Sequence, residues 1–119
     1  MAEPTDNDLV QAHLQGDRAA LNTLLSRYTG PLYRFVLRVC GDSANAEDIV
    51  QETCLKAWRK LSSFQLDRSF KTWIFTIARN TTFDYLKKKK AIPFSSMNEQ
   101  SILEEAFEDQ IEDDRPLPP

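Results

Sequence analysis

The feature that most limits what this chain can fold into is the spacing of its apolar residues. Between Leu21 and Leu61 an apolar side chain recurs every three or four positions, in two long segments. This spacing gathers apolar side chains on one side of an α-helix. A strand would instead alternate apolar and polar residues, and the sequence contains no such run between turn residues. The sequence therefore predicts an all-α fold, a compact bundle of about four to five helices that reaches Lys90.

Residues 45–61 predict one helix whose two faces differ. One face carries small and branched apolar residues that suit a core. The opposite face carries Asp48, Gln51, Glu52 and Leu55, so that a leucine stands among carboxylates. A solvated face with one stray leucine has this pattern, because single exposed apolar residues are common. A surface that binds a protein partner has the same pattern, and the spacing alone favours neither interpretation.

A second helix, of about 20 residues, is predicted to begin after a capping residue at Ser69. Away from its predicted core face lie Trp73, Phe75, Thr76, Arg79, Asn80, Phe83 and Lys87. Exposed aromatic rings among cations and an amide suit single-stranded DNA, because bases stack on rings, phosphates pair with cations and an amide reads a base edge. Alternatively, Phe75 and Phe83 pack against the earlier helices and Asn80 is ordinary surface. The residues alone favour this second interpretation.

Taken together, the two segments resemble a known family. Residues 48–52 (Asp-Ile-Val-Gln-Glu), followed by residues 55–58 (Leu-Lys-Ala-Trp), resemble the helix by which bacterial sigma factors grip RNA polymerase. Residues 69–81 resemble the promoter-reading helix of the extracytoplasmic-function (ECF) sigma factors. The resemblance runs from about Asp8 to Lys90 and covers the domain called region 2. Two motifs in the family's order and spacing make it specific.

The resemblance implies promoter recognition and melting as part of an RNA polymerase holoenzyme, and no enzymatic activity. It assigns Asp48, Gln51 and Glu52 to contacts with core polymerase, on the clamp coiled coil of the largest subunit. Leu55 joins them because it lies on the same predicted face. An anti-sigma factor is a further partner that the family implies. The corresponding location is the cytoplasm.

The second implied partner is the single-stranded non-template strand of the promoter minus-ten element. Asn80 matches the family's main reading position. Looser resemblance and geometry add Phe64, Lys71, Phe75, Thr76, Arg79 and Lys87 as DNA-binding residues. In the family, the loop that corresponds to Phe64 receives a base flipped out of the strand. Many relatives carry a glycine after this aromatic residue, and Gln65 in its place leaves the base preference of the loop open.

The charge of the chain changes sign near Ser95. From there to the end, eight acidic residues stand against one arginine, a net charge of −7, while the whole chain carries −3 and the remainder therefore +4. We expect a domain at residues 1–94 and an acidic, disordered linker at residues 95–119 that mimics DNA and competes weakly for the basic helix. The family's second domain, which reads the minus-35 element, is expected to be absent.

Composition argues against catalysis and against a metal site. The chain has one histidine, no Gly-rich phosphate loop, and two cysteines without paired spacing, which we expect to be reduced. We therefore expect no cofactor and no metal. No apolar run approaches the roughly 20 residues that cross a bilayer, so no membrane insertion is expected. An alternative function is a sigma-like helical adaptor that binds only proteins, such as an anti-sigma factor. Binding to single-stranded promoter DNA would separate the two.

Overall fold

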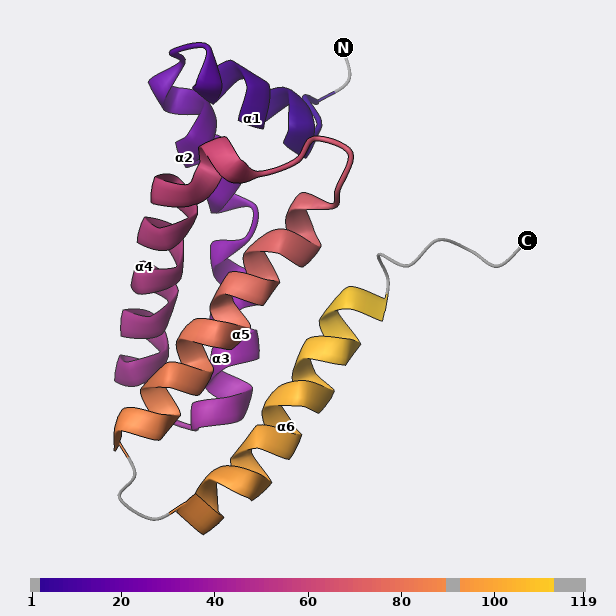
Figure 1. The fold of residues 1–119 in the computed structure, drawn as a ribbon. Helices are drawn as coiled ribbons and strands as arrows, with labels where there is room; N and C mark the ends of the chain where they lie inside the picture. Colours follow the sequence, from indigo (N-terminus) through magenta and orange to yellow (C-terminus); the bar gives the residue numbers. More distant parts are fainter. Residues whose placement is uncertain (1–2, 90–92, 113–119) are drawn as a thin grey trace, which may run out of the picture.

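The computed structural model describes residues 3–89 and 93–112, and all regular structure among them is helical (Figure 1). The order is α1 (Asp6–Leu14), α2 (Arg18–Ser26), α3 (Thr29–Cys40), α4 (Ser43–Lys60), a 3-10 turn (Leu61–Ser63), α5 (Phe70–Lys89) and α6 (Pro93–Ile111). The all-α prediction is confirmed. The described residues form six α-helices, one more than the upper estimate, because α6 was not expected.

Short-range chemistry explains where several helices begin and end. Asp17 and Asp42 accept hydrogen bonds from backbone N–H groups in the first turns of α2 and α4, which otherwise have no partner within the helix. Gly41 ends α3 in the left-handed conformation, at a φ of 70°, which residues other than glycine rarely adopt. Pro31 lies in the first turn of α3, where its missing N–H has no helical partner to lose.

Helix α5 lies at the centre of the molecule. In Figure 1 it runs between α4 and α6, and it also contacts α3. Its buried residues cover roughly half of its circumference at about 100° per residue. The largest fully buried side chains of the described core are Phe35, Phe70, Phe75, Leu24, Leu32, Leu61, Ile74 and Leu103. Helices α1 and α2 pack on each other at one end of this bundle.

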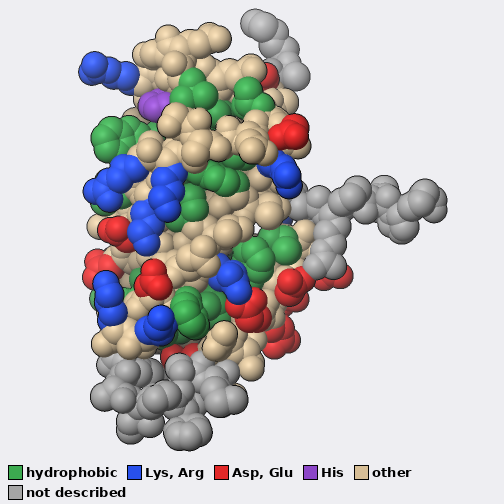
Figure 2. Space-filling model, viewed as in Figure 1, with side chains coloured by type: hydrophobic (Ala, Val, Ile, Leu, Met, Phe, Trp, Pro, Cys, Tyr) green, Lys and Arg blue, Asp and Glu red, His purple; other side chains and the backbone are tan. Residues whose placement is uncertain are grey.

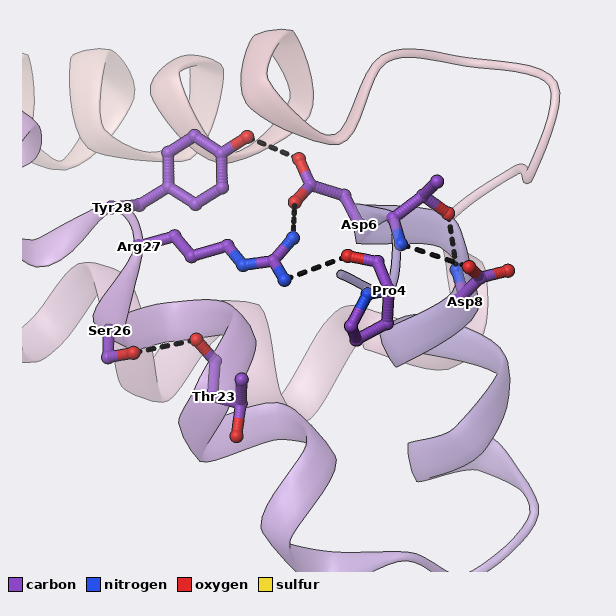
Figure 3. Close-up of polar contacts among 8 residues, drawn as sticks. Pro4, Asp6, Asp8, Thr23, Ser26, Arg27 and Tyr28 are labelled. Carbon is purple, nitrogen blue, oxygen red and sulfur yellow. Dashed lines mark hydrogen bonds and ion pairs between the residues drawn. The ribbon is translucent and has the colours of Figure 1, made fainter. Parts of the chain in front are cut away.

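One carboxylate ties α1 to the junction between α2 and α3 (Figure 3). Asp6 forms an ion pair with Arg27 at 3.0 Å and accepts a hydrogen bond from the hydroxyl of Tyr28. The same arginine donates to the backbone carbonyl of Pro4 at 2.8 Å. Thr5 and Asp8 close a capping box at the start of α1. This network compensates for the small apolar contribution of α1, in which only two side chains are buried.

We predict that Asp6→Ala lowers the free energy of unfolding by about 1–2 kcal/mol, since it leaves the Arg27 guanidinium without its carboxylate partner. Tyr28→Phe removes one of the two interactions and keeps the ring against Phe70. It should therefore cost less than Asp6→Ala. Urea unfolding followed by circular dichroism measures both variants. An unchanged midpoint for Asp6→Ala would show that the network contributes nothing to stability.

Helix α6 corrects the expectation of a disordered linker from Ser95 onward. Leu103 and Ala106 are completely buried, and the helix contacts α5 and α3. Phe107 lies partly buried beside them, so residues 103, 106 and 107 form one apolar stripe. Three apolar positions among acids are too few to fold alone, but a groove between two formed helices can bury them. The expected domain boundary after residue 94 falls inside α6, and residues 113–119 of the expected linker lie outside the described residues.

We predict that Leu103→Ala costs about 2–3 kcal/mol of stability through the cavity that it leaves. Ile102→Ala is the matched control, because Ile102 neighbours Leu103 in the helix but is exposed. It should change stability by less than about 0.5 kcal/mol. Thermal unfolding of the two variants side by side makes the comparison. Equal effects would mean that α6 is not packed on the domain in solution.

Candidate nucleic-acid and protein interfaces

The four residues predicted to contact polymerase lie on α4 but face two different hollows. Gln51 and Leu55 line a groove towards α2 and α3. Asp48 and Glu52 line a smaller hollow towards α5. The carboxylates therefore flank Leu55 on one side and do not surround it.

The groove between α4 and α2 is the larger of these two hollows, with a volume of about 440 Å³. Leu55 is 47% exposed at its edge, and Trp58, one turn further along α4, is 57% exposed. Leu21 and Leu25 of α2 form the opposite wall. Sequence analysis missed Trp58 and the α2 wall. The signal for Trp58 was its position three residues after Leu55, which puts both on one helix face.

A partly buried thiol lies in the same groove. Cys54 contributes to its lining, and burial raises the pKa of the thiol above its ordinary value. The thiol therefore stays protonated near neutral pH, and the groove presents an apolar floor there. No ionised group competes with apolar contacts at this position.

The hollow between α4 and α5 is charged. Besides Asp48 and Glu52, its lining includes Asp84 of α5 and the lysines Lys56 and Lys88, around about 240 Å³. Lys56 donates to the hydroxyl of Thr81 at 3.0 Å, which links α4 to α5 across the hollow. With both signs of charge in one place, this hollow has no strong preference for an anion or a cation.

Along α5, polar side chains stand outside the fully buried positions. Asn80 and Lys87 are exposed, and Lys71, Thr76 and Arg79 are partly exposed. The Thr76 hydroxyl donates to the backbone carbonyl of Thr72 at 2.7 Å. The ammonium group of Lys87 lies 5.2 Å from the centre of the Phe83 ring, within reach of a cation–π contact. Arg79, Lys87, the amide of Asn80 and the edge of Phe83 thus lie on one side of α5, while Lys71 lies at the start of the helix beside a different hollow.

The structure contradicts the prediction that Phe75 stacks on a base. Its side chain has no exposed surface, and its ring meets that of Phe35 in α3 edge to face, with ring centres 5.5 Å apart. The prediction took one stripe of α5 as its core face and the opposite side as exposed. Because α5 is in fact buried along about half of its circumference, part of that opposite side, including Phe75, packs against α3. A base cannot reach this ring without unpacking the core.

Phe64 is also a core residue. It is 6% exposed and its ring lies 5.6 Å from Phe70 and 5.4 Å from Trp73. Its predicted direct role on DNA is therefore wrong for the folded domain. The ring instead fixes the start of the loop that leads to α5, since adjoining aromatic rings add to the stability given by burial.

This loop is held by a helix that sequence analysis did not connect with it. The side-chain amide of Asn7 in α1 donates to the backbone carbonyl of Leu66 at 2.6 Å. Further along, Ser69 accepts a hydrogen bond from the Thr72 backbone N–H and caps α5, as predicted. A hollow of about 410 Å³ opens between the two segments, lined by Thr5, Asp6, Asn7, Tyr28, Arg68, Ser69, Phe70 and Lys71. Polar groups and two cations thus surround a space next to the loop.

Comparison with known proteins identifies this arrangement of helices. The family model described as sigma-70 region 2 matches residues 24–92, which include α3, α4 and α5. The chain belongs to the sigma-70 region 2 family. Its similarity to individual relatives places it among the ECF sigma factors. The family resemblance read from the two motifs is therefore confirmed.

Two of these relatives are sigma-E factors. The chain is 40% identical to the ECF RNA polymerase sigma-E factor of Haemophilus influenzae, over 89% of its own length and 54% of the relative. It is 39% identical to that of Escherichia coli K12, over 87% of its length and 53% of the relative. The sigma region 2 domain described here thus spans about half the length of these curated relatives.

A solved structure shares the fold. It is an engineered region 2 of sigmaE in complex with GTAAAA, with 40% sequence identity and a TM-score of 0.69. The match covers 75% of this chain and 94% of that one. Within the described part of our sigma region 2 domain, no helix is long and apolar enough to cross a membrane. Those same residues contain no cluster of three or more side chains suited to hold a metal ion.

Proposed function

We propose that this domain binds core RNA polymerase and recognises and melts the promoter minus-ten element in transcription initiation. The observation that carries the proposal is the exposed position of Asn80 on the same side of α5 as the cations Arg79 and Lys87, in a chain 40% identical to an engineered region 2 of sigmaE solved in complex with GTAAAA. An amide offers a base edge one donor and one acceptor, and neighbouring cations hold phosphates. The domain acts without catalysing a reaction, in the cytoplasm where polymerase works.

For polymerase, the proposed contact is the groove edge on α4. Leu55 and Trp58 offer exposed apolar surface, and Asp48 and Glu52 supply negative charge on the adjoining side of the helix. This combination suits a basic partner with an apolar centre, such as the coiled coil of the largest subunit's clamp. An anti-sigma factor that blocks polymerase binding would have to cover the same edge.

We predict that Leu55→Ser combined with Trp58→Ser weakens binding to core polymerase at least about thirtyfold, because exposed apolar anchors at an interface centre carry much of its affinity. The measurement is pull-down of purified core enzyme by the tagged chain. Leu14→Ser is the control, since Leu14 on α1 is as exposed as Leu55 but lies outside the groove. Undiminished pull-down by a double variant with intact circular dichroism would rule out this surface.

For DNA, Asn80 is proposed to read a base edge, while Lys71, Arg79 and Lys87 hold phosphates. Thr76 lies beside them, but its hydroxyl proton is directed to its own helix, so it would act as an acceptor. The hollow beside the loop, lined by Arg68 and Lys71, is the proposed place for a base turned out of the strand. Phe64 supports this hollow from within the core.

We predict that Asn80→Ala weakens binding to GTAAAA by about 1–3 kcal/mol and leaves binding to a permuted hexamer nearly unchanged. Lys87→Ala should weaken both hexamers alike and lower the salt dependence, because it removes a phosphate contact. Fluorescence anisotropy over a series of salt concentrations measures both. A loss that is equal for the two hexamers in Asn80→Ala would remove the reading role. Absence of any DNA binding by a chain that still binds polymerase would favour the protein-only adaptor.

A further inference from the structure

Arg79, a proposed phosphate contact on α5, is already bound in the free domain. Its guanidinium forms an ion pair with Glu104 of α6, with Nε 2.9 Å from the carboxylate Oε1. The same guanidinium lies over the ring of Phe107, 5.4 Å from the centroid. It also donates to the side-chain oxygen of Asn80 at 3.2 Å. Glu104, Arg79 and Asn80 therefore form a chain of contacts from α6 to the proposed reading residue.

A second arginine is held in the same way. Arg38 of α3 forms an ion pair with Asp109 of α6 at 2.8 Å. Glu104 and Asp109 are five residues apart on one helix, and their partners stand on two different helices of the bundle. In Figure 2 acidic side chains line the edge of the molecule formed by α6, next to basic side chains nearer its middle. The acidic helix thus covers a cationic surface shared by α3 and α5.

We propose that Arg38 and Arg79 form one phosphate-binding surface for which α6 and a single-stranded nucleic acid compete. The proposal rests on the proposed DNA-binding function and adds Arg38 and a masking helix to it. Carboxylates on a regular helix offer arginine the same charge-assisted contacts as phosphate oxygens. When the strand takes both arginines, the oxygen of Asn80 loses its arginine donor and can accept from a base.

The balance of forces allows such an exchange. Both ion pairs are between a third and a half exposed, so each contributes little to stability and is weakened by salt. The remaining attachment of α6 to the bundle comes from the buried side chains of Leu103 and Ala106. A helix held by weak ion pairs and a short apolar stripe yields to a polyanion, whose phosphates gain affinity by releasing counterions.

The test compares two charge-matched double variants of the 119-residue chain, binding to a labelled single strand that contains GTAAAA. Glu104→Gln with Asp109→Asn removes both carboxylates that hold the arginines. Glu105→Gln with Glu112→Gln removes the same charge from two exposed positions of the tail for which the described structure shows no ion pair. At low salt the first variant should bind about threefold to tenfold more tightly than the second, and the gap should close as salt rises.

A second pair of variants separates helix displacement from charge. Leu103→Ala loosens α6 without altering any charge and should also tighten DNA binding, whereas Ile102→Ala should not. If the strand binds but Glu104→Gln with Asp109→Asn matches its control, and Leu103→Ala matches Ile102→Ala, the competition is refuted and the proposed function stands. If neither the unaltered chain nor any variant binds the GTAAAA strand more tightly than a strand of permuted sequence, the proposed function is refuted, and the competition is refuted with it.

Discussion

Everything in this domain depends on the burial of α5 along about half of its circumference. Helices α3, α4 and α6 all pack against it, and the aromatic contact between Phe75 and Phe35 lies within that packing. A helix held on so wide an arc is rigid, and only the remaining half of its circumference can present side chains to a ligand. Asn80 and Lys87 stand on that half. The scaffold thus limits which residues can meet a ligand before any ligand is present.

The helices up to α5 could be predicted because each carries its own apolar stripe, and several begin at a polar cap, such as Asp17 for α2 and Ser69 for α5. Helix α6 could not be predicted in this way. Its stripe is three residues long, and its stability comes from the surface that α3 and α5 form together. The surface that α3 and α5 form together is not visible in the local spacing of apolar residues in α6.

The candidate site residues also differ in whether local spacing or tertiary packing decides their exposure. Motif spacing singled out Leu55 and Asn80, and both are exposed in the structure, because local helix geometry decides which residues share a face. It failed for Phe75 and Phe64, because their burial depends on how many neighbours surround α5 and where the loop is anchored. It also missed the α2 wall of the groove, which exists only once the bundle has formed.

The attachment of α1 has a consequence for the loop before α5. Asp6 and Asn7 are consecutive residues, yet one holds the junction of α2 and α3 and the other holds the loop carbonyl of Leu66. Both bonds depend on the rotational phase of α1, which its buried Leu9 and Val10 set. Loss of one residue between these polar and apolar positions would turn the two bonds away by about 100°. The shape of the loop is therefore encoded partly in the helical phase of a segment nearly sixty residues earlier in the chain.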